Sequence, residues 1–85
     1  MDHETVLDLV KQEGLEKYAR FGRPDAGSAN KVCLFHDGAR WVIVITDERA
    51  VVQERTIREF DSEPDALTYM VGALRVMKGY LEFSR

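Results

Sequence analysis

Five consecutive apolar residues at positions 41–45, Trp-Val-Ile-Val-Ile, constrain the fold of this chain more than any other feature. The run is largely β-branched, which favours a strand over a helix. Successive side chains of a strand point to opposite faces, so the sheet is apolar on both faces here. Helices on one face leave the other face to be covered. Two kinds of cover are open: the chain's own N-terminal segment and loop 22–30, or a partner or second copy docked on that face.

Turn signals place this run in the middle of three strands, at residues 31–36, 40–46 and 51–60. Asp37-Gly38 is a strong hairpin signal between the first two strands. Residues 47–50 turn the chain again before the third strand. The apolar residues of the third strand change parity along it, which predicts a β-bulge.

Helical periodicity flanks these strands on both sides. Residues 4–21 carry apolar side chains three and four positions apart, which predicts a helix. Gly14 inside it costs about 1 kcal/mol relative to alanine, so the element can divide there into a helix and a turn. The last helix begins after Ser62, its N-cap. Its apolar stripe consists of Leu67, Met70, Leu74, Met77 and Leu81.

Eighty-five residues make one domain. We therefore expect a single α+β domain over residues 1–85, in the order α-β-β-β-α. Two successive hairpins give a three-stranded antiparallel sheet whose strand order follows the chain. Both helices are expected on one face of this sheet.

Few residues are suited to catalysis or to metal binding. Cys33 is the single cysteine and lies in an apolar run, so a small buried side chain is favoured over a nucleophile, which would need a neighbouring base. His3 and His36 lack metal-ligand spacing. We expect no catalytic residue, no metal and no cofactor. The N-terminus lacks a signal-peptide pattern and no apolar run reaches membrane-spanning length, so a cytoplasmic protein without membrane contact is expected.

The charge pattern argues against nucleic acid as a partner. The chain has 12 Lys and Arg against 15 Asp and Glu, a net charge of −3. Double-stranded-RNA-binding domains share the α-β-β-β-α order, but they contact phosphates through basic residues at the start of the last helix. Here that start carries Glu59, Asp61, Glu63 and Asp65, and residues 59–74 contain no Lys or Arg. Capping of the helix explains Asp65 and Glu63, but it explains Glu59 less well. A binding surface formed by these acids is the alternative interpretation.

The order of these features resembles small immunity proteins of bacterial polymorphic-toxin systems over residues 14–78. The segments that carry the resemblance are residues 14–18 (Gly-Leu-Glu-Lys-Tyr), 41–49 (a tryptophan strand with a Glu-Arg turn) and 60–67 (a Phe-Asp-Ser-Glu helix start). Ala50 departs from the pattern, which has glycine in the turn, and loop 22–30 is longer.

The resemblance implies a non-catalytic protein that binds a cognate toxin and blocks its active or substrate-binding surface. An acidic inhibitor complements a basic toxin cleft. The contact set that we expect is Trp41, Asp47, Glu48, Arg49, Glu59, Asp61 and Glu63. Two alternatives remain open: an interaction module that dimerises through its sheet face, and a subunit that lends an acidic residue to a partner's site.

Overall fold

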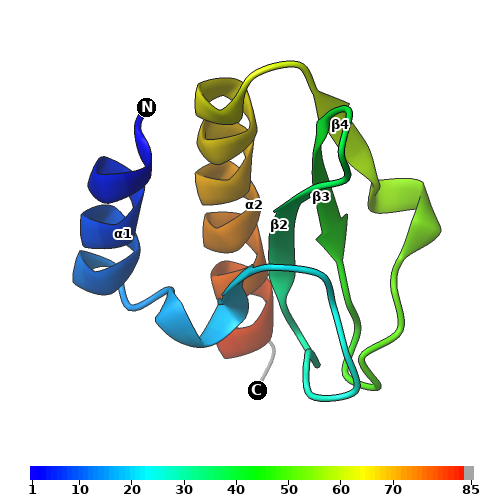
Figure 1. The fold of residues 1–85 in the computed structure, drawn as a ribbon. Coiled ribbons are helices and arrows are strands. Elements are labelled where there is room, and N and C mark those ends of the chain that lie inside the picture. The colour runs from blue at the N-terminus through cyan, green and yellow to red at the C-terminus, as the bar shows by residue number, and fades with distance from the viewer. Residues whose placement is uncertain (84–85) are drawn as a thin grey trace.

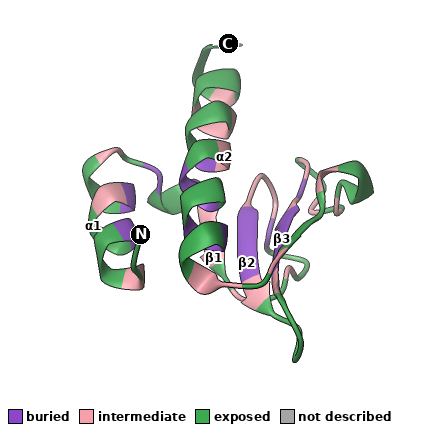
Figure 2. Ribbon diagram, turned by 90° about the horizontal axis from the view of Figure 1, so that it is seen from above, coloured by how far each residue is buried: buried purple, intermediate pink, exposed green. Residues whose placement is uncertain are grey.

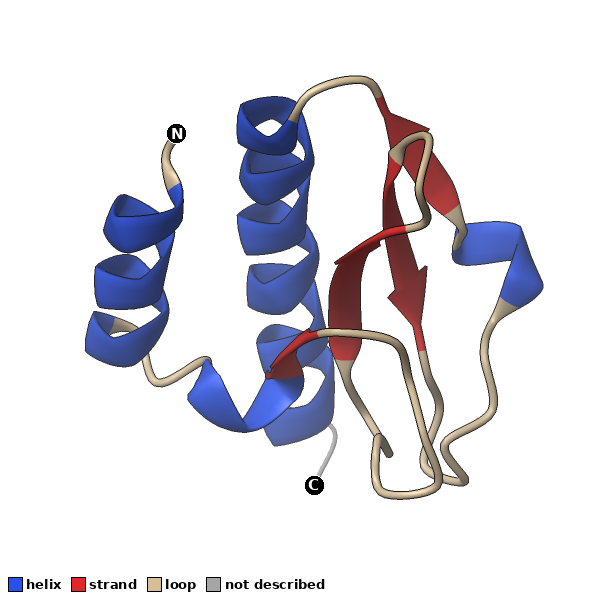
Figure 3. Ribbon diagram, in the orientation of Figure 1, coloured by secondary structure: helices blue, strands red, loops and turns tan. Residues whose placement is uncertain are grey.

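Within residues 1–83, which the structure describes, the chain forms two α-helices and four strands (Figures 1 and 3). The structure is a computed structural model. The α-helices are α1 (His3–Gln12) and α2 (Glu63–Phe83), and the single-turn 3-10 helices are η1 (Glu16–Tyr18) and η2 (Glu54–Thr56). The strands are β1 (Ala19–Phe21), β2 (Val32–His36), β3 (Trp41–Ile45) and β4 (Arg58–Phe60). The predicted α+β class is confirmed.

The sheet has four strands in the order β1-β2-β3-β4 over this part of the chain, and not the three predicted. The β2–β3 hairpin is present as predicted, and β4 pairs antiparallel with β3. β1 instead pairs in parallel with β2, with Ala19 opposite Val32 and Phe21 opposite Leu34. The prediction of a wholly antiparallel sheet is therefore wrong at this edge. Parallel neighbours require the chain to return along the length of a strand, and residues 22–31 make that return.

The predicted helix over residues 4–21 is wrong in its second half, because α1 ends at Gln12. Gly14 has a φ of 69°, a left-handed conformation that glycine adopts without steric cost and that a right-handed helix excludes. The Leu15 N–H then donates to the carbonyl of Val10 at 2.8 Å. The chain does divide at Gly14, but beyond the η1 turn it continues as a strand.

The predicted third strand, residues 51–60, is interrupted by η2 and has no continuous pairing with β3. A single bridge joins Val52 to Thr46, and the Gln53 N–H donates to the carbonyl of Ile45 at 2.7 Å. The chain then leaves the sheet through η2 and returns only as β4 (Figure 1). The change of parity thus marks an excursion out of the sheet and not the β-bulge that we predicted.

Both helices lie on one side of the sheet, as predicted (Figures 1 and 2). α2 packs directly on the strands, and α1 packs against α2. Burial follows the predicted stripe, since Leu67, Met70 and Leu74 are fully buried while Met77 and Leu81 are partly buried. The sheet meets this stripe with Val32, Leu34 and Ile43, and α1 adds Val6 and Val10.

The opposite face of the sheet carries a second buried cluster. Cys33, Val42 and Val44 are at most 6% exposed, with Phe35 and Val52 packed against them. The prediction that Cys33 is a small buried side chain is confirmed, and this burial raises the pKa of its thiol.

The chain's own loop covers this face. The Arg23 guanidinium lies over the ring of Phe35, 4.6 Å from its centroid. The buried Thr46 hydroxyl accepts the Lys31 N–H at 2.9 Å and donates to the carbonyl of Ser28. Of the two kinds of cover that the sequence left open, the chain's own loop supplies it. The expected contribution of the N-terminal segment is wrong, because α1 packs against α2 and adds Val6 and Val10 to the core on the other side of the sheet. The exposed apolar face that motivated the dimer prediction is not present in residues 1–83.

Candidate protein-binding site

The seven residues of the predicted contact set lie at opposite ends of β3. Trp41 begins the strand and Glu59, Asp61 and Glu63 lie near it, at the end of β4 and the start of α2. The segment 47–49 follows the other end of β3. A five-residue strand is about 17 Å long, so one small contact cannot include both groups.

The acidic end is less acidic in space than along the sequence. Arg40, in the β2–β3 turn, donates to Asp61 Oδ1 from its Nη2 at 2.9 Å and its Nε at 3.1 Å. This hydrogen bond raises the pKa of Arg40. His3 Nδ1 lies 3.9 Å from Glu63 Oε2. Arg40 therefore supplies, from elsewhere in the chain, the positive charge that residues 59–74 lack.

Trp41 and Glu59 are close in the sheet but face opposite sides. Trp41 pairs with Phe60 and packs half-buried against the helix-side core, with the His36 ring 4.9 Å away. Glu59 pairs with Val42, whose side chain lies in the opposite cluster. Because cross-strand partners share a face, Trp41 and Glu59 do not form one contact surface.

Asp47 organises the turn after β3. Its Oδ1 accepts the N–H of Arg49 at 2.8 Å and of Val51 at 3.0 Å, and its Oδ2 accepts Gln53 Nε2 at 3.3 Å. The backbone hydrogen bond from Val51, followed by that from Arg49, lowers the pKa of Asp47. The Asp47 carboxylate is thus held by hydrogen bonds within the turn, whereas the neighbouring Glu48 is exposed.

The lowered pKa values of two aspartates in turns, Asp37 and Asp47, predict that the fold loses stability in acid. Asp37 accepts the N–H of Arg40 at 2.8 Å and of Ala39 at 2.9 Å, and these bonds lower its pKa as the equivalent bonds lower that of Asp47. The folded state therefore binds fewer protons than the unfolded state in acid. The stabilisation is complete above the unfolded pKa of about 3.9 and is lost as the pH falls through the lower folded values.

We expect the double variant Asp37→Asn, Asp47→Asn to lose less stability in acid than the wild-type protein. Asparagine keeps an oxygen acceptor but does not titrate in this range. Urea unfolding midpoints measured from neutral pH down to about pH 3 would test this, because linkage makes their slope report proton uptake. If the unfolding midpoints of the two proteins fall equally with decreasing pH, the prediction is wrong.

Ala50, in the same turn, has a φ of 63°. This conformation costs an L-residue about 1–2 kcal/mol and costs glycine little. We expect Ala50→Gly to raise the unfolding free energy by about 0.5–1 kcal/mol, after the larger backbone entropy of glycine is deducted. The control Ala39→Gly, at a turn residue without positive φ, should not stabilise in urea unfolding.

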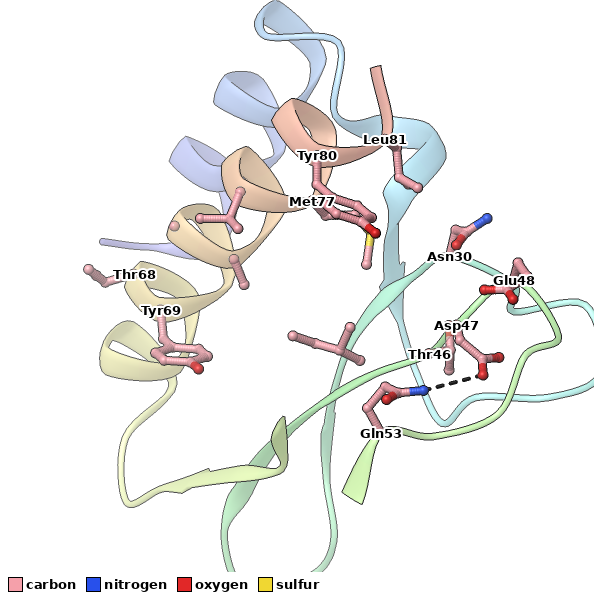
Figure 4. Close-up of a pocket in the computed structure, with 14 residues that line it drawn as sticks. Asn30, Thr46, Asp47, Glu48, Gln53, Thr68, Tyr69, Met77, Tyr80 and Leu81 are labelled. Carbon is pink, nitrogen blue, oxygen red and sulfur yellow. Dashed lines mark hydrogen bonds between the residues drawn. The ribbon is translucent and has the colours of Figure 1, made fainter. Parts of the chain in front are cut away.

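A groove of about 910 Å³ opens between residues 68–81 of α2 and the segment that follows β3 (Figure 4). Side chains from α2 form one wall, and residues of the 45–53 segment with Asn30 form the other. The lining residues of α2 are Thr68, Tyr69, Gly72, Ala73, Val76, Met77, Tyr80 and Leu81. Those of the other wall are Asn30, Ile45, Thr46, Asp47, Glu48 and Gln53.

The groove arises because β4 is short. β4 pairs only with the first three residues of β3, and the chain before it swings outward through η2. No paired strand therefore covers the helix side next to Ile45, which is only partly buried. α2 has 21 residues and is about 31 Å long, so it extends well past a strand of about 17 Å.

The α2 wall of the groove exposes large apolar and aromatic side chains. Val76 is 73% exposed, Tyr80 71% and Tyr69 36%. Exposed apolar side chains that gather on one surface are typical of interaction sites, whereas isolated ones are ordinary. These exposed residues were not predicted as a binding surface, because the prediction for α2 rested on its buried stripe. Their spacing of seven and four residues was the available signal of a second stripe.

The electrostatics of the groove are one-sided. Among its fourteen lining residues only Asp47 and Glu48 carry charge, and both are acidic. Asp47 is paired with Arg49, whose Nη2 lies 3.6 Å from Asp47 Oδ2, so Glu48 is the exposed acid of the lining. The groove therefore includes two residues of the predicted contact set, while Trp41, Arg49, Glu59, Asp61 and Glu63 lie outside its lining.

The described residues show neither a metal-binding cluster nor a membrane-spanning helix. No three His, Cys, Asp or Glu side chains in residues 1–83 come together as a metal site requires. No helix in that range is both long and apolar enough to span a bilayer. Comparisons with protein-family models, curated proteins and solved structures find no match to this chain.

Proposed function

We propose that this chain is an immunity-type protein that binds a cognate bacterial toxin and blocks the toxin's active or substrate-binding surface. The observation that carries the proposal is the exposed apolar groove between α2 and the 45–53 segment. A small protein gains binding energy mainly where aromatic and aliphatic side chains become desolvated against a partner. The groove is the place on the described surface where Tyr69, Val76 and Tyr80 offer such burial together.

Charge supports the same proposal. The net charge is −3, and the charged residues in the groove lining are acids. Complementary fields raise the rate of encounter with a basic partner. A toxin that acts on nucleic acid or on a nucleotide presents such a basic cleft. Glu48 and Asp47 would face it, with Glu48 as the carboxylate that remains exposed.

Production together with the product of the gene directly upstream tests this function. An immunity protein should form a stable complex with that product and abolish its toxicity to the host cell. In a titration, protection should become complete at a fixed stoichiometric ratio, as expected for occlusion and not for turnover. Absence of a complex, with both proteins folded by circular dichroism, would remove the proposed function.

A further inference from the structure

We propose that the groove receives an amphipathic helix of the partner, with an apolar face toward α2 and basic side chains toward Glu48. This inference rests on the proposed function in that it assigns the docking surface of the same interaction. It also goes beyond that function, because it specifies the secondary structure and the charge of the segment that binds.

The length of the groove and the glycine in its α2 wall fit a helix as the bound segment. Its α2 wall runs from Thr68 to Leu81, roughly 20 Å at 1.5 Å per residue, or between three and four helical turns. Gly72 lies in this wall, and a Cβ added there would meet no atom within 4 Å. A glycine inside a helix costs about 1 kcal/mol relative to alanine, and no packing within the described chain requires it. Its absent side chain allows the backbone of a second helix to approach closely.

A strand is the less suitable occupant, because β3 offers no open edge in the groove. Its first three residues pair with β4. The carbonyl of Ile45 accepts the Gln53 N–H at 2.7 Å, and Thr46 bridges Val52. An added strand needs a row of unpaired N–H and C=O groups, and this side of the sheet has already used them. Side-chain burial against α2 is what the groove offers.

The charge of the groove selects a basic partner over a second copy. In a two-fold dimer the same patch meets itself, so its charges must be self-complementary. A groove whose charged lining residues are Asp47 and Glu48 would bring acids against acids. Lys or Arg on a foreign helix removes this repulsion.

Two synthetic helical peptides of about four turns test the inference. They share one leucine-rich face, and the polar face carries Lys and Arg in one peptide and Glu in the other. The basic peptide should bind at least about tenfold more tightly in about 50 mM salt, and the difference should shrink near 500 mM, where charges are screened. Backbone amide shifts should concentrate at Ala73, Met77 and Gln53.

Charge variants of the protein give the matched control. Glu48→Lys should remove most of the preference for the basic peptide, whereas Glu54→Lys should retain it. Both glutamates are exposed, but Glu54 in η2 does not line the groove. Equal affinities, no binding of either peptide, shifts outside the groove, or a concentration-dependent dimer that buries Val76 would each overturn the inference.

The two proposals can fail separately. If the basic peptide occupies the groove as described but the upstream gene product does not bind, the immunity function falls and the groove assignment stands. If the toxin is neutralised while amide shifts place it elsewhere on the surface, the function stands and the groove assignment falls.

Discussion

Leu74→Ala should lower the free energy of unfolding by about 2–5 kcal/mol. Leu74 is fully buried, with 0% solvent exposure, and it packs in the cluster that joins α1, α2 and the sheet. Truncation removes apolar burial and leaves a cavity, while alanine keeps the helix propensity of α2. Small domains have total stabilities of about 5–15 kcal/mol, so the loss is a large fraction of the whole. Urea unfolding followed by circular dichroism measures it.

The matched control is Val76→Ala, two positions along the same helix at a residue that is 73% exposed. Its effect on unfolding should stay within about 0.5 kcal/mol. If the two variants unfold at the same urea concentration, α2 does not present the face toward the sheet that this fold requires.

Val76→Glu should weaken the complex with the proposed toxin partner by about 100-fold, or about 2.8 kcal/mol. The side chain lies in the apolar wall of the groove, so binding would bury a carboxylate without a partner. Folding should survive because Val76 is exposed in the free protein. Surface plasmon resonance or calorimetry with the purified toxin gives the affinity, and protection of cells gives its consequence.

Phe83→Glu supplies the comparison for this effect. Phe83 is 92% exposed on the same helix but does not line the groove. The same gain of negative charge at this position should change the affinity by less than about threefold, as expected for a charge at an interface rim. Equal losses for the two variants would indicate a general charge effect, and an unchanged affinity for Val76→Glu would place the interface elsewhere.

Local signals were sufficient to predict α2 and the β2–β3 hairpin. The stripe that includes Leu67 and Leu74 has the helical period, and Ser62 Oγ accepts the Asp65 N–H at 3.3 Å as an N-cap does. Asp37-Gly38 lies between two apolar runs of strand length. In both cases the interactions that decide the structure join residues close together in the chain.

Three features that the sequence did not predict depend on contacts between residues far apart in the chain. β1 has three residues, and its strand conformation depends on parallel pairing with β2, which no local period indicates. The neutralisation of Asp61 depends on Arg40, which is 21 positions away. The groove depends on the path that residues 47–57 take around the edge of the sheet. Propensity arguments therefore located the acids of the contact set but not the surface to which each belongs.

The central position of α2 has a consequence for how the protein is made. α1 packs against α2 and the helix face of the sheet is closed by α2, so neither earlier part can complete its core without the last element of the fold. During synthesis, α1 and all four strands emerge before α2 does. Until then, the β3 run remains open to solvent on its helix side, where a nascent chain is prone to associate with its neighbours. Burial of the helix side of that run therefore waits until α2 has been synthesised.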